Sequence, residues 1–356
     1  MNNIIFITGG AGYVGAMLLD ILSRRSDVSK IIALDVQPFP DFLNTSGADV
    51  SKIKFIVANT ADNTWQSEVA GYQPNVVIHT AWQIREMYGK KKLQWKWNVT
   101  GSDNIFDFAF TTPSVKKLIH FSTVASYGAF STNTTDHFYK ESEPFRQTNY
   151  LYAEEKRIVE LHLEERYAKA KANGTQVKVA IIRPAAITGP RGRYMRIRFG
   201  LQSALSGALK TQKSYLYKLI SLWVSWVPVT PKWLRQYVHE DDITAAVELL
   251  AFNDLKNQYD AFNVSPPGDC VFGADMAQAV GKRKLPIQPW MVRLAFFWVW
   301  HLTRGRIPTS KGSWKGYSYP IAVTGAKITN MYGFKYRWTS KEAFTTRDGI
   351  YSKYAK

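Results

Sequence analysis

Cysteine is almost absent from this chain. Cys270 is the one cysteine among 356 residues, so no disulfide can form within the chain, and this composition is compatible with the reducing cytosol. We therefore expect a cytoplasmic protein stabilised by a hydrophobic core, and we predict no metal site. Hydrophobic residues make up 46% of the sequence and charged residues 21%, which excludes a disordered chain. The length suffices for two domains, or for one large domain with a lobe.

Acidic residues are scarce. The chain has 28 Asp and Glu against 46 Lys and Arg, a net charge of +18. The basic residues are spread along the chain, and they are densest at 90–92 and 191–198. No nucleic-acid reader motif accompanies them. We therefore predict a small-molecule substrate and no specific nucleic-acid partner. An anionic substrate and an anionic membrane surface both remain open as explanations of the excess charge, and so does a homodimer as the oligomeric state.

Long apolar runs are also missing. The two most aromatic stretches, 215–229 and 289–302, are shorter than the about 18–20 apolar residues that a membrane span requires. We therefore predict no spanning helix. The preferred interpretation is that both stretches pack in the core or form a wall of the substrate lobe. The alternative is an interfacial helix with peripheral membrane contact, because tryptophans lie beside basic residues in both stretches. We expect no signal peptide before the first strand, which begins at residue 3 or 4.

The feature that organises the chain is a glycine-rich stretch. Residues 8–15 read TGGAGYVG, after the apolar run 4–7 and before an apolar-periodic segment, 13–22. The order strand, glycine turn, helix is typical of dinucleotide binding. Glycines permit a tight turn that approaches a pyrophosphate, and the helix N-terminus presents free N–H groups to it. The residues expected to hold the pyrophosphate are Gly9, Gly12, Tyr13, Val14 and Gly15.

Asp35 supplies a second signal for the same ligand. It ends the apolar run 31–34 and lies 20 residues after Gly15. An acid at this position holds a ribose 2′-hydroxyl of a dinucleotide. A glycine turn without a ligand is the alternative, and the presence of Asp35 argues against it. We therefore predict a dinucleotide cofactor, and the family resemblance described below implies that it is NAD.

Strand and helix patterns alternate through the first half of the chain. Such alternation predicts an α/β fold, a Rossmann-type doubly wound parallel sheet with helices on both faces. We expect an NAD-binding domain over 1–184 and a smaller C-terminal substrate lobe over 185–356, with 236–265 returning to the sheet as helix and strand. The predicted strands are 3–8, 31–35, 53–58, 75–80, 117–122 and 177–183. The predicted helices are 13–25, about 64–70, about 93–110 and 150–172.

Ligands of such sheets bind beyond the carboxyl ends of the strands, so polar and small residues there are candidates. Asn59 and Asp62 follow the third strand, where the Asn59 amide oxygen or the Asp62 carboxylate could accept from the adenine amino group; simple turn chemistry is the alternative. Thr80 and Ala81 end the fourth strand, and small residues there would let the backbone pass close to the cofactor. Asn98 lies in the next helix, where its poor helix propensity suggests packing or hydrogen bonding.

Three residues form a candidate catalytic group. Tyr152 and Lys156 are four residues apart in a predicted helix and therefore lie on one face. A tyrosine pKa near 10 is too high for a base at neutral pH, but a neighbouring ammonium and an oxidised nicotinamide would both favour the phenolate. Thr123, at the end of the fifth strand, can hold the substrate oxygen. A surface Tyr–Lys pair on a helix is the alternative, and the dinucleotide pattern makes it the weaker one.

These residues together resemble a known family, the extended short-chain dehydrogenase/reductases, also called the NAD-dependent epimerase/dehydratase family. The similarity runs over about 3–348. Its landmarks are TGGAGYVG at 8–15, Asp35, NTAD at 59–62, HTA at 79–81, NVTG at 98–101, FSTVASYG at 121–128, YAEEK at 152–156, RPAAITGP at 183–190, RQYVHEDD at 235–242 and NVS at 263–265.

The resemblance implies roles for individual residues. Thr123, Tyr152 and Lys156 would be catalytic, and Lys156 would also hold the nicotinamide ribose. Pro184 would lie against the nicotinamide, and Arg235 would reach a substrate phosphate, as in nucleotide-sugar enzymes. The cofactor-binding residues implied are Gly9, Gly12, Tyr13, Val14, Gly15, Asp35, Asn59, Thr60, Thr80, Ala81, Asn98, Lys156 and Pro184, and the substrate-binding residues are Thr123, Tyr152 and Arg235.

Departures from the family pattern narrow the activity. Val124 and Ala125 stand where sugar 4,6-dehydratases carry Asp-Glu, which argues against dehydration. The region 216–233 is aromatic and apolar where nucleotide-sugar epimerases have a glycine-rich stretch. The leading hypothesis is an NAD-dependent oxidoreductase that acts on a secondary alcohol, with a nucleotide-sugar epimerase as one form of it. A hydroxysteroid-type or other lipophilic-alcohol dehydrogenase is the alternative. A non-catalytic NAD-binding or membrane-surface protein is the alternative of another class.

Overall fold

A seven-stranded, entirely parallel sheet forms the centre of the molecule. The computed structural model describes residues 2–192, 226–279 and 281–354. The strand order is β3-β2-β1-β4-β5-β7-β12, so the order reverses between β1 and β4, where ligands of such sheets bind. The strands are β1 (Asn3–Thr8), β2 (Val28–Asp35), β3 (Ile53–Val57), β4 (Val76–His79), β5 (Lys117–Phe121), β7 (Lys178–Pro184) and β12 (Tyr259–Val264). This confirms the predicted doubly wound α/β fold.

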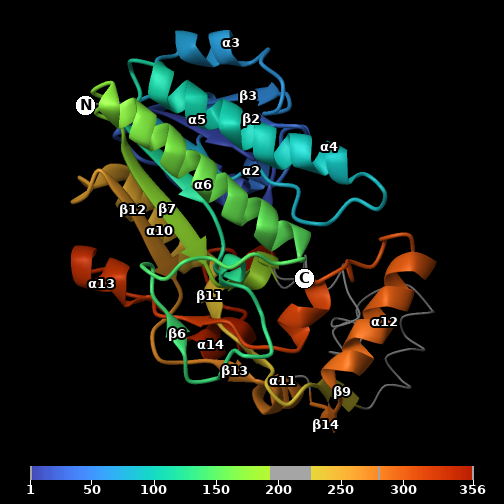
Figure 1. The fold of residues 1–356 in the computed structure, drawn as a ribbon. Helices are drawn as coiled ribbons and strands as arrows, with labels where there is room; N and C mark the ends of the chain where they lie inside the picture. The colour runs from blue at the N-terminus through green and yellow to red at the C-terminus, as the bar shows by residue number, and fades with distance from the viewer. Residues whose placement is uncertain (1, 193–225, 280, 355–356) are drawn as a thin grey trace.

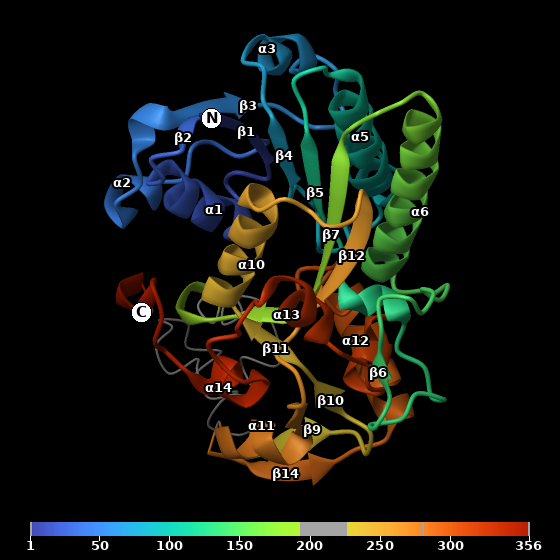
Figure 2. The ribbon, with the colours of Figure 1, turned by 90° about the vertical axis from the view of Figure 1, so that its left-hand side faces the viewer.

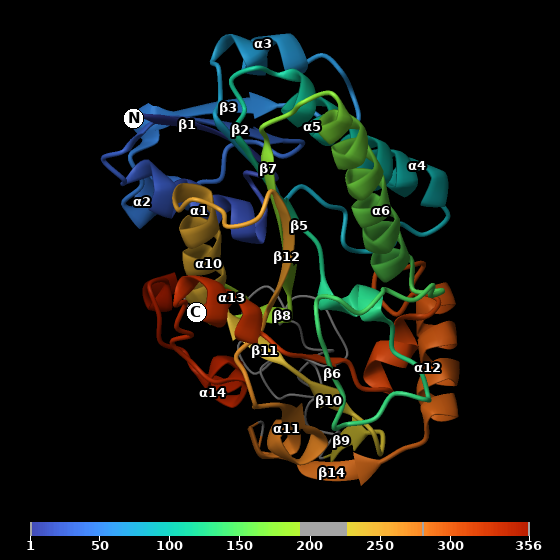
Figure 3. The ribbon, with the colours of Figure 1, turned by 60° about the vertical axis from the view of Figure 1, so that its left-hand side comes forward.

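Helices cover both faces of the sheet (Figures 2 and 3). Side chains of β1 alternate between two cores: Ile5 and Ile7 pack with α1 and α10, and Phe6 packs with α5 and α6. This alternation is the period of two that a strand imposes. One face carries α1 (Tyr13–Ser23) and α10 (Glu240–Phe252), and the other carries α5 (Gly101–Thr111) and α6 (Leu151–Ala172). Shorter elements around the sheet are α2 (Leu43–Ser46), η1 (Val50–Lys52), α3 (Gln66–Gly71) and η3 (Val124–Tyr127).

The helix predicted over about 93–110 differs in detail. It consists of α4 (Lys91–Trp95), a π-helical turn η2 (Lys96–Thr100) and α5. Asn98 lies in the middle of the π turn. Such turns interrupt the regular i→i−4 hydrogen bonding and occur frequently at functional sites.

The C-terminal half builds a smaller lobe below the carboxyl edge of the sheet (Figure 1). Its strands pair two by two: β8 with β11, β9 with β14, β10 with β13, and β15 with β6. Trp233 and Tyr237 lie in its main buried cluster. Its elements are β6 (Phe138–Tyr139), β8 (Ala186–Thr188), β9 (Trp226–Val229), β10 (Leu234–Arg235), β11 (Tyr237–His239), β13 (Val271–Phe272), α11 (Gly273–Ala279), β14 (Arg283–Pro286), α12 (Pro289–Leu302), η5 (Ser313–Tyr317), β15 (Ala322–Val323), α13 (Ala326–Tyr332), α14 (Ser340–Thr345) and η6 (Ser352–Tyr354).

The two aromatic stretches have different structures. Residues 289–302 form helix α12. Residues 215–225 lie outside the described residues, while the end of that stretch, Trp226–Val229, is strand β9 rather than a helix. Within the described ranges, no helix combines the length and the apolar character that crossing a membrane demands.

Candidate active site

The glycine turn joins β1 to α1 and has the geometry that a pyrophosphate needs. Gly9 has a φ of +76°, a conformation that residues with a Cβ rarely adopt. A Cβ on Gly15 would lie 1.9 Å from the Gly9 carbonyl oxygen, so only glycine fits there. Gly12 caps α1 without any side-chain hydrogen bond, and the first turn of the helix carries no acid. The residues present therefore suit a diphosphate at the helix N-terminus.

The Asp35 carboxylate is fixed beside this turn. Its Oδ2 accepts from the Ala11 N–H at 3.0 Å and its Oδ1 accepts from the Gln37 N–H at 2.9 Å. Each oxygen retains a lone pair for a ribose hydroxyl. Tyr13 donates its hydroxyl to the Glu240 carboxylate, and Val14 packs against the core. The contribution of Tyr13 and Val14 to a cofactor site therefore rests on their main-chain N–H groups.

Asn59 and Thr60, which were predicted to contact the cofactor, both make hydrogen bonds within the protein. The Asn59 Oδ1 accepts from the Ala61 N–H at 2.9 Å, which is the turn chemistry that the sequence left open. The Thr60 carbonyl accepts from the Asn104 amide at 2.9 Å. A Cβ on Gly101 would lie 2.4 Å from the Thr60 hydroxyl oxygen, so this turn packs tightly on α5. Contact of Asn59 and Thr60 with an adenine stays a prediction.

The end of β4 lies close to the glycine turn. Thr80 donates its hydroxyl to the Thr8 carbonyl at 2.7 Å, and the Ala81 N–H donates to the Thr8 hydroxyl at 3.3 Å. A Cβ on Gly9 would lie 2.7 Å from the Ala81 nitrogen. Small residues at 80 and 81 therefore allow the two strand ends to meet where the cofactor is expected.

Asn98 belongs to a buried polar network. Its Oδ1 accepts from the Gln83 N–H at 2.8 Å, while its Nδ2 donates to the Gln83 carbonyl at 3.0 Å and to the Glu155 carboxylate at 2.7 Å. The same Glu155 oxygen accepts from Gln94 at 3.1 Å. Burial nevertheless raises the Glu155 pKa above its ordinary value. The Asn98 side chain thus ties the loop after β4 to α6, and a direct contact with the cofactor stays a prediction.

Thr123 and Tyr152 are brought together at the carboxyl end of β5. Their side chains lie close together, and the Thr123 hydroxyl acts to lower the Tyr152 pKa, which favours the phenolate. Thr123 is buried and caps η3 by accepting from the Ala125 N–H at 3.2 Å. Tyr152 lies in the first turn of α6 and is partly exposed. A substrate oxygen placed between the two hydroxyls could reach both.

Lys156 is held differently from the expectation. Its ammonium donates to the Phe121 carbonyl and lies 3.6 Å from the centroid of the Trp82 ring, while only 3% of the residue is exposed. Burial lowers the Lys156 pKa to about 7, although Glu160 and Glu155 oppose the shift. The expected lowering of the Tyr152 pKa is wrong for the protein alone, because burial raises this pKa and only the nearby Thr123 hydroxyl opposes the shift. The reason is that the ammonium is directed to Phe121 and Trp82.

The predicted substrate residue Arg235 lies on the lobe side of this centre. Its guanidinium carbon is 5.0 Å from the centroid of the Tyr317 ring, and its Nη2 is 3.4 Å from the Gly316 carbonyl oxygen. Tyr150 connects this group to Tyr152, since their ring centroids are 5.8 Å apart. Burial raises the Tyr150 pKa, and Tyr152, Arg235, Tyr317 and Glu86 all act on it electrostatically. Pro184 ends β7 at the same edge of the sheet, paired with Val264; its contact with the nicotinamide stays a prediction.

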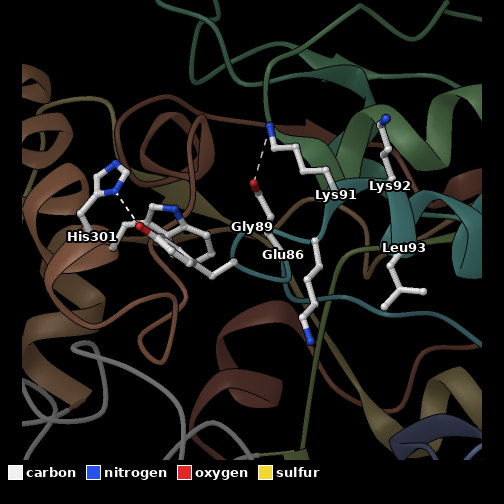
Figure 4. Close-up of a pocket in the computed structure, with 9 residues that line it drawn as sticks. Glu86, Gly89, Lys91, Lys92, Leu93 and His301 are labelled. Atoms are coloured by element: carbon white, nitrogen blue, oxygen red, sulfur yellow. Dashed lines mark hydrogen bonds and ion pairs between the residues drawn. The ribbon is translucent and has the colours of Figure 1, made fainter.

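Several residues of the site had no signal in the sequence. Trp82 follows the HTA motif, but only the fold shows its ring over Lys156. Tyr150 and Tyr317 are far apart in the sequence, but the fold brings them close enough to interact electrostatically. A neighbouring cavity of about 700 Å³ lies between the loop after β4 and α12 (Figure 4), and none of the three predicted catalytic residues lines it. His239 is fully buried, and its ring is tilted against that of Trp338 with 3.7 Å between the centroids.

The parallel sheet, the glycine turn and the Thr–Tyr–Lys group at its carboxyl edge define a dinucleotide-dependent enzyme of the short-chain dehydrogenase/reductase type. The sequence profile of the NAD dependent epimerase/dehydratase family matches residues 5–265. The chain therefore belongs to the NAD-dependent epimerase/dehydratase family, as the resemblance predicted, and NAD is its cofactor.

Relatives of different activities share this similarity. The chain is 28% identical over 195 residues to a sterol-4-alpha-carboxylate 3-dehydrogenase of Candida albicans, covering 54% of this chain and 52% of the relative. It is 25% identical over 258 residues to a dTDP-D-glucose 4,6-dehydratase of Dictyostelium discoideum, covering 69% of this chain and 55% of the relative. The chain thus spans about half the length of these curated relatives. Among solved structures, the Bordetella bronchiseptica enzyme WbmG, in complex with NAD and UDP, has a TM-score of 0.68 at 19% identity, covering 99% and 94% of the two chains.

Proposed function

We propose that the chain oxidises a secondary alcohol at the carboxyl edge of the sheet. Tyr152 is the general base, Thr123 binds the substrate oxygen, and Lys156 binds the nicotinamide ribose. The proximity of the Thr123 and Tyr152 side chains carries this proposal, because it brings two hydroxyl groups together at the carboxyl end of β5. Residues 1–184 with 236–265 form the NAD-binding unit, and the remaining residues of 185–356 form the substrate lobe. We expect the protein in the cytoplasm.

NAD⁺, when bound, supplies a hydride acceptor and a positive charge beside the phenol. Tyr152 accepts the hydroxyl proton of the alcohol, and Thr123 donates to the same oxygen as its bond to carbon gains double-bond character. The buried position of the Thr123 hydroxyl strengthens its hydrogen bond to the substrate relative to water. Such proton transfer by a positioned side chain contributes about 10²–10⁴-fold to the rate.

We infer that the substrate is lipophilic. Aromatic rings lie on the lobe side of Tyr152: Tyr150 lies beside it, the Tyr317 ring lies 5.0 Å from the Arg235 guanidinium carbon, and Phe296 packs on Tyr317 with 5.0 Å between centroids. Rings in this arrangement favour an apolar ring system over a hydrated sugar. Val124 and Ala125 after Thr123 leave no acid for a dehydration step. The similarity to a sterol dehydrogenase agrees with this choice.

A nucleotide sugar is the second candidate, and Arg235 favours it. A guanidinium that acts on Tyr150 next to Tyr152 could bind a phosphate of such a substrate. The complex of WbmG with UDP agrees with this alternative. An epimerase would return the hydride to the other face of the ketone and release no NADH.

The test is a substrate panel with NAD⁺ and the purified chain. The expected result is stoichiometric NADH, followed by absorbance, with a 3β-hydroxysteroid or another lipophilic secondary alcohol. Isomer exchange of UDP-glucose without net NADH would overturn the lipophilic assignment and support the epimerase. Turnover of neither class, in protein that still binds NAD⁺, would contradict both.

A further inference from the structure

Helix α12 carries an apolar stripe that faces solvent. Trp290 is 64% exposed, Trp298 is 55% exposed and Leu302 is 78% exposed. These positions recur on one face of the helix, at the spacing of i, i+4, i+7 and i+8. The exposed apolar residues of this face are Trp290, Met291, Leu294, Phe297, Trp298 and Leu302.

The opposite face of α12 already has its partners. Val292 and Trp300 are buried, and Phe296 packs on Tyr317 of η5. Helix α12 is thus apolar on both sides. A helix with this pattern is normally covered on every side by protein or lipid. Packing among the described residues of the lobe accounts for the inner side only, and the outer stripe has no apolar partner within that part of the chain; an exposed apolar patch of this kind marks an interaction site.

The loop after β4 extends this stripe. Tyr88 packs on Trp300 with 5.5 Å between centroids, and its hydroxyl lies 3.2 Å from His301 Nδ1. The exposed apolar side chains of the loop and of α4 are Ile84, Tyr88, Leu93 and Trp95. In Figure 1 the loop and α4 lie on the same side of the molecule as α12, and Figure 4 shows the cavity between them. The stripe of α12 and these four residues are together called the aromatic face.

Basic residues predominate in the segments that carry the aromatic face. Residues 276–341 contain 12 Lys and Arg and no Asp or Glu, and residues 90–92 are three consecutive lysines. The acidic residue of the loop, Glu86, is turned inward, with only 7% of its side chain exposed, and pairs with Lys91 at 3.7 Å. Segments 166–239 and 276–341 together hold 26 of the 46 basic residues and none of the 28 acidic ones. Segment 276–341 carries α12, and segment 166–239 runs from the end of α6 into the lobe, so the positive charge of the chain is concentrated in these two segments rather than spread evenly.

We propose that the aromatic face binds an anionic phospholipid surface. Tryptophans at the level of the headgroups, apolar side chains below them and lysines or arginines around them are the components of an interfacial helix. The 14 residues of α12 are too few to cross a bilayer but sufficient to lie in its plane. Positive charge around the aromatic face favours binding to anionic lipid over neutral lipid. If the aromatic face binds a protein instead, its binding should not depend on phospholipid. The inference is independent of the proposed reaction.

The test is co-sedimentation with vesicles of phosphatidylcholine alone and of phosphatidylcholine mixed with phosphatidylglycerol. We expect binding to the mixed vesicles at low salt, weaker binding at high salt and little binding to the neutral vesicles. The pair Trp290→Ser and Trp298→Ser should abolish binding, and the pair Lys90→Gln and Lys92→Gln should lower the partition coefficient roughly tenfold or more.

Matched controls lie on α6. Leu161→Ser removes a side chain that is 45% exposed, and Lys169→Gln with Lys171→Gln removes two charges from the last turn of that helix; both should bind as the wild type does. Thermal unfolding of every variant identifies loss of fold. No binding of the wild type at low salt would overturn the proposal, and so would binding that the tryptophan variants retain. A wild-type dimer that the tryptophan pair dissociates, without vesicle binding, would assign the aromatic face to a second copy of the chain.

Discussion

Replacing Lys156 with methionine tests the electrostatics of the site most directly. The ammonium is 3% exposed, and burial lowers its pKa from 10.5 to about 7. At 1.36 kcal/mol per pKa unit, protonating this lysine is about 5 kcal/mol less favourable in the folded protein than in the unfolded chain. Methionine keeps the length of the side chain but loses the hydrogen bond to the Phe121 carbonyl and the contact with Trp82, worth about 1–2 kcal/mol.

The sign of the effect depends on pH. From about pH 7 to 10.5 the unfolded chain holds a proton that the folded protein lacks, so the Lys156 contribution to stability rises with pH. Below pH 7 both states are protonated and the full penalty remains. We therefore expect Lys156→Met to raise the unfolding free energy by about 3 kcal/mol near pH 6. This gain should disappear, and then reverse, as the pH approaches 10.

Thermal unfolding without added NAD, followed by circular dichroism across this pH range, measures the effect. Lys156→Arg keeps the buried charge and should gain nothing, while Lys169→Met, an exposed lysine of α6, controls for the substitution itself. The reasoning is refuted if Lys156→Met is destabilised equally at both ends of the range. The same variant should lose stabilisation by NAD, because Lys156 is proposed to bind the nicotinamide ribose.

Three further predictions concern the predicted site residues. Tyr152→Phe should lower kcat by about 10²–10⁴-fold with unchanged NAD affinity by calorimetry, and Thr123→Ala should lower kcat in the same direction; unaltered turnover in both would exclude them as catalytic residues. Asp35→Arg should weaken NAD binding and favour NADP, and an unchanged preference in titrations of both cofactors would contradict the ribose contact. Gly15→Ala places a Cβ 1.9 Å from the Gly9 carbonyl oxygen, so we expect this variant to lose NAD binding and to have a lower melting temperature. If the variant binds NAD as tightly as the wild type does, the turn can relax to accommodate the Cβ.

Local patterns were enough for much of the fold. The alternating apolar runs predicted six of the seven strands of the central sheet to within a few residues, because a strand buried on both faces is apolar along its length. The glycine spacing and Asp35 predicted the turn, since the requirement for a missing Cβ is a property of single residues. Asn59 shows the limit of such reasoning: the same side chain suits a turn and an adenine contact, and here it makes the turn.

Only the tertiary structure determined the pKa values of the site residues and the solvent exposure of helix α12. Four-residue spacing puts Tyr152 and Lys156 on one face of α6, but burial and the positions of Phe121 and Trp82 determine where the ammonium points and in which direction both pKa values move. The composition of 289–302 predicted either a core helix or an interfacial one, and the exposed Trp290 and Trp298 belong to an outer face that the described residues of the lobe do not cover. Spacing along the chain sets which side chains share a face, whereas solvation depends on every segment that packs around that face.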